Sequence, residues 1–505
     1  MIDSHPRTKL AVAVLDGPRV DFGELDDRSA RLAQFLRRRG LHPGDRVAAL
    51  LENSATYAIV VWAARRSGLR LVPLNWQLTS GEIRYVIEDC DARALIASES
   101  LVATAASALE NLSEPSVRLC DGTSAGAFVA LDTAIAGEPT AQLPNQLDGP
   151  VMYYSSGTTG KPKGIMRPLG PLRYGEQRPI EAFYASLFGL GPDTRLLLPA
   201  PLYFAAPLGW MSATLALGGS VAILRRFDAE HVLRAIETQR ITHGLFVPTH
   251  LVRLLRLPEE ARSRFDLSSL KLAIHAGAPC PPELKQAMID WWGPRISEYY
   301  SGSEGAGFVS ASAEEWLARP GTVGRSKGSR IHILDDSGKE CPHGQIGTVY
   351  FENAPRFEYH KAPEKTAAYF TPEGWGSLGD MGWLDTDGYL FLADRKIDLI
   401  ISGGANIYPQ EIEAVLLGHP AVYDAAVIGI PNPEFGEEAK AIIQPESNST
   451  PDAALAAEIL TFCRARLASF KCPKTIEFVP TLPRHANGKL LKRELRARYI
   501  GAFPV

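Results

Sequence analysis

The feature that most constrains the fold of this chain is a regular alternation of short apolar runs with segments of helical periodicity. Apolar residues recur at helical spacing over residues 22–39, and Gly40 ends that segment. The apolar run at residues 47–51 precedes a second helical segment at 57–67, and residues 68–74 form another apolar run. Strands that alternate with helices pair in parallel and are covered on both faces, so the sequence predicts an α/β fold.

The alternation returns after residue 180 and changes in the last third of the chain. Helices and strands are expected in turn at residues 180–189, 194–198, 229–239, 244–247 and 281–292. From residue 321 to 350 the spacing shortens, which predicts a small antiparallel barrel or sheet with strands at 330–334 and 347–352. A second, mixed α and β unit is expected from about Asp394. This unit is expected to begin with a hairpin around residues 402–404 and a helix from residue 409. Strands are expected at 425–430, 440–444 and 475–479, and a second helix at 452–467.

Composition favours a globular protein without a nucleic-acid partner. Hydrophobic residues make up 45% of the 505 residues and charged residues 22%, an ordinary balance in a chain long enough for two or more domains. The formal net charge is −4, so no global field attracts nucleic acid or an anionic membrane. An anionic ligand must therefore be held by local positive charge.

Two further features predict a cytoplasmic protein without a transmembrane segment. The uncharged run at residues 196–224 is long enough to cross a bilayer, but its prolines and glycines favour a buried strand–helix–strand segment with an apolar pocket wall. The six cysteines are scattered and the first residues lack a signal peptide, so reduced thiols in the cytoplasm are expected. Peripheral membrane contact and a homodimer stay open.

Residues 154–164 carry the strongest chemical signal. They read Tyr-Ser-Ser-Gly-Thr-Thr-Gly-Lys-Pro-Lys-Gly, in which glycines let backbone N–H groups approach phosphate oxygens while hydroxyls and lysines add donors and charge. A Walker P-loop needs Ser or Thr after its Gly-Lys, and Pro162 stands there instead. A flexible linker is the alternative interpretation.

This segment resembles the phosphate-binding loop of the adenylate-forming superfamily, which includes acyl- and aryl-CoA synthetases, peptide-synthetase adenylation domains and luciferases. The family's other segments follow in its order over residues 150–490, and the first 150 residues resemble it more weakly. The resemblance implies that ATP is the nucleotide and that Thr158, together with Glu304, holds Mg²⁺. The implied phosphate-binding residues are Ser155, Ser156, Gly157, Thr158, Thr159, Gly160 and Lys163.

Two later segments resemble the family's adenine side. Residues 275–279 resemble the loop that lies along the base, which implies Ala276, Gly277 and Ala278 as contacts. Residues 298–304 resemble Tyr-Gly-x-Thr-Glu, with Ser301 in place of Gly and Ser303 in place of Thr. By this match Tyr300 stacks on adenine, Ser303 contacts the α-phosphate and Glu304 binds the cation. Ordinary core packing is the alternative for Tyr299 and Tyr300.

Residues 375–380 and 388–398 resemble the ribose-binding and hinge segments. The match implies that Asp380 and Arg395 bind the ribose, although Leu378 replaces a Thr and a turn is the ordinary place for such an Asp. The implied hinge is Asp394 to Lys396. The resemblance therefore predicts two domains. Residues 1–394 would form two stacked βαβ subdomains plus a small β-barrel, and residues 395–505 a small mobile α+β domain.

The predicted mobile domain carries residues that the resemblance assigns to two successive steps of the reaction. Residues 482–489 resemble the segment of the catalytic lysine, Lys489, and Gly403 with Gly404 would face the pantetheine of coenzyme A. Alone, Lys489 would be read as a surface lysine. Residues 464–498 hold ten Lys or Arg against two acids, which indicates either a solvated basic face or a surface for coenzyme A phosphates.

The expected acyl pocket is apolar. Relatives that activate amino acids place an Asp near Phe204, and none stands there; many acyl-CoA relatives have His at that position. A fatty, alicyclic or aromatic monocarboxylate is therefore favoured, since a second buried carboxylate would need a cation. The expected pocket residues are Phe204, Ala205, Gly209, His250, His275, Ser301 and Gly302.

The resulting hypothesis is an ATP-dependent acid–thiol ligase that forms an acyl-adenylate and transfers the acyl group to coenzyme A. A fatty acyl-AMP ligase that loads a carrier protein is the alternative within the same family. A light-emitting monooxygenase and a non-catalytic nucleotide-sensing homologue stay open as other classes. Loss of Lys489, Glu304 or Asp380 would favour the non-catalytic class, and all three are present.

Overall fold

The computed structural model describes residues 2–144, 146–155, 162–395, 398–402, 405–432, 435–484 and 490–500. The chain packs as two compact units. Unit 1 comprises Met1–Phe246, Arg256–Ile274 and Arg356–Ala368, and unit 2 comprises Val247–Leu255, His275–Pro355 and Tyr369–Val505. The domain boundary expected after residue 394 stays a prediction.

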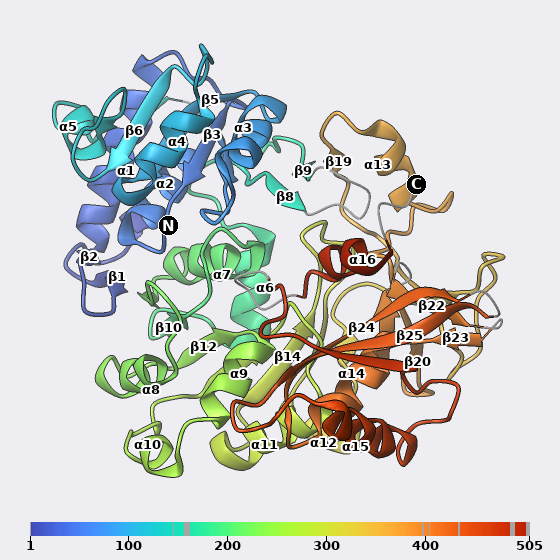
Figure 1. Cartoon of the computed structure of the whole chain (residues 1–505). Coiled ribbons are helices and arrows are strands. Elements are labelled where there is room, and N and C mark those ends of the chain that lie inside the picture. The colour runs from blue at the N-terminus through green and yellow to red at the C-terminus, as the bar shows by residue number, and fades with distance from the viewer. Residues whose placement is uncertain are drawn as a thin grey trace. The chain divides into compact units, whose positions relative to one another are not determined.

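Unit 1 contains a five-stranded parallel sheet with helices packed on it (Figure 1). The twelve residues of the second helix are all buried, because this helix contacts strands of both large sheets of the unit. The strand order is β4 (Arg70–Pro73), β3 (Arg46–Leu50), β5 (Ala92–Ser98), β6 (Val117–Asp121) and β7 (Val129–Ala130). The helices are α1 (Phe22–Arg38), α2 (Ala55–Arg66), α3 (Ser80–Asp89), α4 (Val102–Ala108) and α5 (Leu131–Ile135).

A second sheet of unit 1 places its central strands in parallel. Its order is β13 (Leu272–His275), β12 (His243–Phe246), β10 (Arg195–Leu198), β11 (Ser220–Ile223), β1 (Leu10–Val14) and the antiparallel β2 (Arg19–Asp21). The connecting helices are α6 (Pro179–Phe188), α7 (Ala205–Ala216), α8 (Ala229–Thr238) and α10 (Glu259–Ser263). The uncharged run at 196–224 is therefore strand, helix and strand, as predicted. No helix of the described residues is long and apolar enough to cross a membrane.

A small antiparallel sheet of unit 1 consists of β8 (Tyr153–Ser155), β9 (Lys163–Met166) and β19 (Glu358–Tyr359), and α13 (Pro363–Tyr369) follows it. Strands β8 and β9 form a hairpin whose tip is the predicted phosphate loop. Residues 156–161 of that tip lie outside the described part of the chain.

Unit 2 is built mainly from antiparallel strands. One sheet is formed by β17 (Ile331–Leu334), β18 (Gly347–Phe351), β20 (Asp380–Leu384) and β21 (Leu390–Arg395). Strands β17 and β18 are the two predicted antiparallel strands, and β20 and β21 add two strands from outside the predicted range. A second set comprises β14 (Ile296–Tyr300), β15 (Val309–Ala311) and β16 (Arg325–Ser326). Three helices of this part are α9 (Pro248–Leu255), α11 (Pro282–Trp292) and α12 (Ala313–Ala318).

The C-terminal part of unit 2 is a sheet with helices on both faces. Two separate apolar clusters use alternate residues of its long strands: one contains Val427 with two of the helices, and the other contains Ile428 with the last helix. The strands are β23 (Ala405–Ile407), β22 (Ile400–Ser402), β25 (Gly436–Pro445), β24 (Val422–Asn432) and β26 (Thr475–Phe478). The helices are α14 (Pro409–Leu417) and α15 (Ala453–Arg464) on one face and α16 (Lys492–Ile500) on the other (Figure 1).

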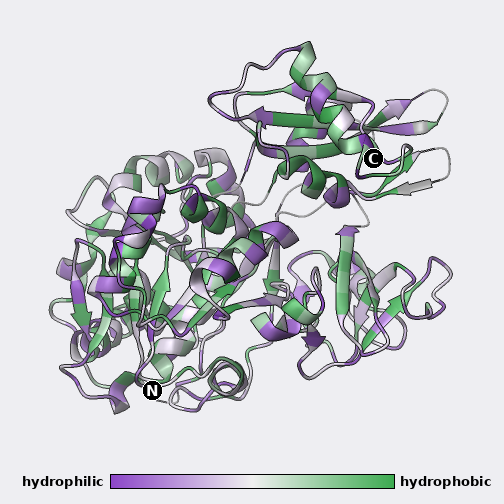
Figure 2. Cartoon of the chain, turned by 90° about the horizontal axis from the view of Figure 1, so that it is seen from below, coloured by the Kyte–Doolittle hydropathy of each residue, from purple (hydrophilic) through white to green (hydrophobic). Residues whose placement is uncertain are grey.

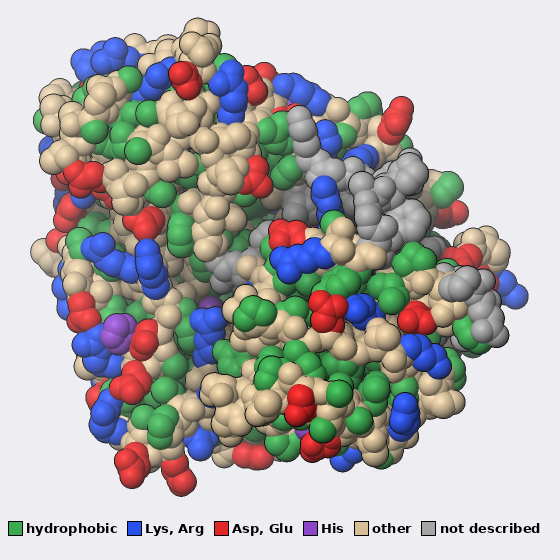
Figure 3. Space-filling view, in the orientation of Figure 1, with side chains coloured by type: hydrophobic (Ala, Val, Ile, Leu, Met, Phe, Trp, Pro, Cys, Tyr) green, Lys and Arg blue, Asp and Glu red, His purple; other side chains and the backbone are tan. Residues whose placement is uncertain are grey.

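The distribution of side chains agrees with the composition. Hydrophobic residues gather on the strands and on one side of many helices (Figure 2). Basic and acidic side chains are interspersed on the face shown in Figure 3, as expected for a net charge of −4. All six cysteines are free thiols. The predicted mixed α/β fold is confirmed.

Candidate active site

The hairpin that carries the predicted phosphate loop is fastened to helix α3. The Tyr154 hydroxyl donates to the Asp89 carboxylate at 2.6 Å, and the Tyr85 hydroxyl donates to the Pro162 carbonyl at 3.0 Å. Burial, together with Asp89, raises the pKa of Tyr154, so its phenol stays a donor. The register of the hairpin pairs Ser155 with Lys163. Both ends of the loop are thus fixed in place, while the Ser155 side chain lies outside the described structure.

Three predicted nucleotide residues converge in unit 2. The Tyr300 hydroxyl, at the end of β14, donates to an Asp380 oxygen at 2.6 Å. Asp380 is 8% exposed and opens β20, and the strand register places residue 395 directly opposite it on β21. These positions come from three segments up to 95 residues apart, and the Arg395 side chain itself is not described. The fold therefore brings the predicted base-binding and ribose-binding positions together.

The two tyrosines of β14 have different surroundings, which bears on whether each is a core residue or an adenine-binding residue. Tyr299 is buried, and its ring stacks on Phe308 with centroids 4.8 Å apart and an interplanar angle of 14°. Tyr299 is thus a core residue. Tyr300 points to the opposite face of the strand, is half-buried and tilts against Phe351 at 6.2 Å. Its position agrees with the predicted role but leaves stacking on adenine a prediction.

A tight turn presents Ser303 and Glu304 after β14. The Ser301 hydroxyl donates to the Gly307 carbonyl at 2.7 Å, and the Gly305 N–H donates to the Gly302 carbonyl at 3.0 Å. Gly305 has φ +80°, a conformation that favours glycine. A Cβ at residue 302 would stand 2.3 Å from a Leu378 methyl carbon, so glycine there admits the Leu378 side chain.

A buried ion pair lies next to the predicted adenine loop. The Lys285 ammonium, on α11 and 0% exposed, donates to Glu298 at 2.8 Å. His275 is 1% exposed, with Nε2 3.7 Å from the same Glu298 oxygen. Burial lowers the pKa of His275 and Lys285 lowers it further, so this imidazole is neutral, while burial raises the pKa of Glu298 against the opposing effect of Lys285.

Sequence reasoning assigned no role to Lys285 or Glu298. One signal could have found the lysine: it occupies the apolar face of α11, three, four and seven residues before Met288, Ile289 and Trp292, where a charge needs a partner. Because this pair joins α11 to β14, it fixes the strand that ends in Tyr300 relative to the loop that starts at His275.

The predicted acyl-pocket residues are distributed over both units. In unit 1, Phe204 caps α7, and Ala205 and Gly209 are half-exposed on that helix. A Cβ at Gly209 would meet no atom within 4 Å, so this helix surface borders open space. In unit 2, His250 on α9 is buried, which lowers its pKa to about 3. The contacts of His250 and His275 with an acyl group stay predictions.

The predicted hinge is tied to helix α14. The buried carboxylate of Asp394 accepts from the Gln410 N–H at 2.9 Å and from the Gln410 side-chain amide at 3.3 Å. Gln410 lies in the first turn of α14, where unpaired N–H groups and the helix dipole favour an anion. Lys396, Gly403 and Gly404 lie outside the described residues.

The segment that holds Lys489 is fixed at its base. Arg484 donates two hydrogen bonds to Asp424, at 2.6 and 2.5 Å, and pairs with Leu490 across a β-bridge. Residues 485–489 lie between these anchors and outside the described structure.

Part of the positive charge of residues 464–498 is neutralised by acids outside that stretch. At least four cations in the described part of this stretch form ion pairs, which favours a structural role for them; the predicted contact of this face with coenzyme A stays a prediction. The pairs are Lys471–Glu411, Arg484–Asp424, Lys492–Glu413 and Arg496–Asp398.

Comparison with known proteins accounts for nearly the whole chain. The family model of AMP-binding enzymes matches residues 3–355, and the model of the AMP-binding enzyme C-terminal domain matches residues 411–489. A feruloyl-CoA synthase of Amycolatopsis sp is 36% identical over 492 residues, which cover 96% of this chain and 94% of that protein. A long-chain fatty acid–CoA ligase of Mycobacterium tuberculosis is 31% identical, over 99% of this chain and 97% of the ligase.

Solved structures agree with the sequence comparisons. ATP-bound MatB from Rhodopseudomonas palustris superposes with a TM-score of 0.85 at 30% identity, over 98% of this chain and 96% of MatB. The described fold, with a large N-terminal and a small C-terminal domain, is that of these enzymes. The chain therefore belongs to the family of AMP-binding, adenylate-forming enzymes, in its branch of acyl- and aryl-CoA synthetases, which are acid–thiol ligases.

Proposed function

We propose that the chain converts an apolar monocarboxylic acid, ATP and coenzyme A into the acyl-CoA thioester, AMP and pyrophosphate, by way of the acyl-adenylate. The observation that carries the proposal is the convergence of Tyr300, Asp380 and residue 395. The phenol–carboxylate hydrogen bond fixes an aromatic ring beside an acceptor for sugar hydroxyls, as adenosine recognition requires.

In the first half-reaction the acid's carboxylate attacks the α-phosphorus of ATP, and pyrophosphate leaves. Both reactants are anions, so the protein must hold them in line and neutralise charge. Lys163, which begins β9 directly after the predicted phosphate loop, and Lys489 supply positive charge. Glu304 fits a magnesium ion, because Mg²⁺ takes one or two carboxylates together with phosphate and water oxygens; when bound, the ion would neutralise phosphate charge. The predicted partner ligand Thr158 belongs to the loop tip.

We propose that residues 395–505 act as the mobile domain and turn about residues 394–396 before the second half-reaction. Coenzyme A's thiol then attacks the acyl carbonyl, and AMP leaves. The contact of Asp394 with Gln410 supports this assignment, since it links the proposed pivot directly to α14, the first helix of the proposed mobile domain.

The acid is proposed to be aromatic or aliphatic and to carry one carboxylate. The half-exposed surface of α7 presents Phe204, Ala205 and Gly209, with no charged side chain in the helix. The 36% identity to a feruloyl-CoA synthase supports an aryl acid, and the ligase of M. tuberculosis supports a fatty acid. An apolar wall accepts both and disfavours a dicarboxylate.

Substitution of Gly209 by Leu is expected to narrow this pocket. The added side chain would occupy the open space beside α7, so kcat/KM for ferulate or a long-chain acid should fall about tenfold or more relative to propionate. Steady-state kinetics with the paired acids measure this ratio. Gly209→Ala is the matched control: it restores helix propensity but adds a single methyl group, and it should leave the ratio nearly unchanged. An unchanged ratio in Gly209→Leu would place the acyl group elsewhere.

A panel of carboxylic acids tests the proposed function. Exchange of labelled pyrophosphate into ATP reports the first half-reaction, and coenzyme A–dependent release of AMP reports the second. Acid-dependent exchange together with coenzyme A–dependent turnover is expected. Exchange with turnover only on an acyl carrier protein would favour the carrier-loading alternative, and no exchange with any acid would reject adenylate formation.

A further inference from the structure

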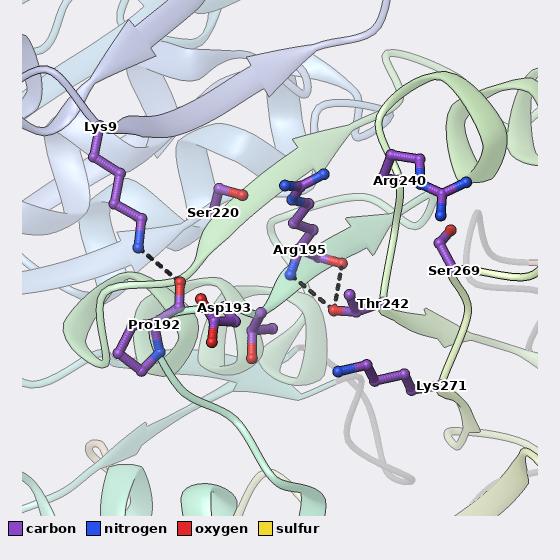
Figure 4. A pocket seen from close by; sticks show the side chains of 10 residues that line it. Lys9, Pro192, Asp193, Arg195, Ser220, Arg240, Thr242, Ser269 and Lys271 are labelled. Carbon is purple, nitrogen blue, oxygen red and sulfur yellow. Dashed lines mark hydrogen bonds between the residues drawn. The ribbon is translucent and has the colours of Figure 1, made fainter.

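A hollow of about 350 Å³ lies at the amino ends of the strands of the second sheet in unit 1 (Figure 4). Each of five strand starts contributes at least one polar residue, which comes just before or at the first strand position. These are Lys9 for β1, Arg195 for β10, Ser220 for β11, Thr242 for β12 and Lys271 for β13, and Arg240 adds a further cation. We call this hollow the strand-start pocket.

The pocket lies at the edge of the sheet opposite to the one used by the proposed reaction. Strands β1, β10, β11 and β12 are parallel, so their amino ends share one edge and their carboxyl ends the other. The segment that leads to Phe204 and α7 leaves from the carboxyl end of β10, the edge at which open α/β sheets bind their substrates. The strand-start pocket is therefore distinct from the predicted acyl wall.

Positive charge dominates the lining. Four cations face a single carboxylate, that of Asp193. Among the described residues, Lys9, Arg195 and Lys271 have no carboxylate within ion-pair distance, and Lys9 donates instead to the Pro192 carbonyl at 2.7 Å. Arg240 pairs with Asp266 at 3.0 Å. In a chain with a net charge of −4, this is a local excess of cations over acids.

The backbone fixes these side chains relative to one another. The Arg195 N–H donates to the Thr242 hydroxyl at 2.9 Å, and the Lys271 N–H donates to the Thr242 carbonyl at 2.8 Å. Thr242 thus ties two of the cationic strand starts together. Arg240, directly after the C-cap of α8, has φ +51°, a left-handed conformation that glycine usually supplies. A left-handed backbone conformation strains a residue other than glycine, and such strain is often found at functional sites.

We propose that the strand-start pocket binds a small phosphate-bearing anion of two or more charges. Two guanidinium groups offer planar forks that match phosphate oxygens, two lysines add point charges, and Ser220 adds a hydroxyl donor. The volume accommodates a di- or triphosphate group. Lipid headgroups share this chemistry, but a hollow lined by residues at one sheet edge matches a free anion, and we commit to that source.

Calorimetric titration of the whole protein with inorganic pyrophosphate at low ionic strength tests this proposal. The variant Arg195→Gln with Lys271→Gln removes two exposed cations, and the control Arg19→Gln with Lys339→Gln removes two exposed cations outside the pocket. All variants carry Lys163→Ala, which weakens binding at the predicted phosphate loop. The pocket variant should bind pyrophosphate at least tenfold more weakly than the parent, and the control should match the parent. Added salt should weaken binding to the parent, because exposed charges are screened.

Equal pyrophosphate affinity in the parent and the pocket variant would overturn the proposal. So would binding to phosphatidylglycerol vesicles that the pocket variant loses, if pyrophosphate neither binds the parent nor competes with the vesicles, since the occupant would then be a lipid surface. Because the pocket side chains lie at the sheet edge opposite to the one that leads to α7, the double variant without Lys163→Ala should keep its acyl-CoA ligase activity when no added anion is present.

Discussion

Replacement of Lys489 by Ala should slow acyl-adenylate formation about a hundredfold or more, the usual loss when one preorganised charge donor is removed from a developing anion. We propose that the Lys489 ammonium group stands between the attacking carboxylate and the α-phosphate only during the first half-reaction. Thioester formation from preformed acyl-adenylate should therefore proceed at close to the parent rate. Single-turnover measurements of pyrophosphate release and of acyl-CoA formation separate the two steps.

Replacement of Asp394 by Pro should give the opposite pattern. Asp394→Pro fixes the backbone angle φ at the proposed pivot, so it should impair thioester formation more than adenylation. Asp394→Ala removes the side-chain contacts with Gln410, as Asp394→Pro does, but leaves φ at residue 394 free to change. Comparison of the two variants therefore separates the effect of losing the contact with α14 from the effect of restricting rotation at the pivot. If Lys489→Ala and Asp394→Pro both damage only the first half-reaction, alternation between two domain arrangements is wrong.

The sequence predicted the fold where periodicity and punctuation agree. Helix α1 ends next to Gly40 and α11 begins at a Pro-Pro pair, and both lie close to their expected bounds. It did not predict α16, whose residues 492–500 alternate charged and apolar side chains without a strong helical face. Leu495 inserts into the cluster with Ile428 and Tyr499 packs against it, and packing of this kind is decided by the tertiary structure.

The candidate site, like the fold, could be predicted from the sequence only in part. Motif resemblance identified Tyr300, Asp380 and Arg395 as separate segments, but no local pattern states that a phenol donates to a carboxylate 80 residues away. The strand-start pocket is similar: Lys9, Arg195 and Lys271 each resemble an ordinary strand boundary in the sequence, and only the parallel register brings them to one edge. Long-range pairing is what a linear pattern leaves out.

Replacement of Lys285 by Met should destabilise unit 2 by about 3–5 kcal/mol, because it leaves the Glu298 carboxylate buried without its cation. The expected loss is a fall of roughly 10 °C in the transition temperature of this unit. Scanning calorimetry with and without ATP measures the shift. Lys339→Met, a change at an exposed lysine, is the control and should stay within about 0.5 kcal/mol of the parent.

The double variant Lys285→Met with Glu298→Gln tests whether the lost stability comes from the unpaired charge. It removes both charges, so most of the stability should return, whereas a double variant as unstable as Lys285→Met would attribute the loss to packing against Trp316.

The pH dependence of the stability of Lys285→Met gives a second test. Burial raises the pKa of Glu298 in the folded state, and loss of Lys285 should raise it further. A group with a raised folded pKa stabilises the fold below its unfolded pKa and loses that contribution as pH rises through the folded value. The difference in free energy of unfolding between Lys285→Met and the parent should therefore shrink toward pH 4.5, because protonation neutralises the carboxyl that the lysine no longer compensates. The same difference should grow toward neutral pH.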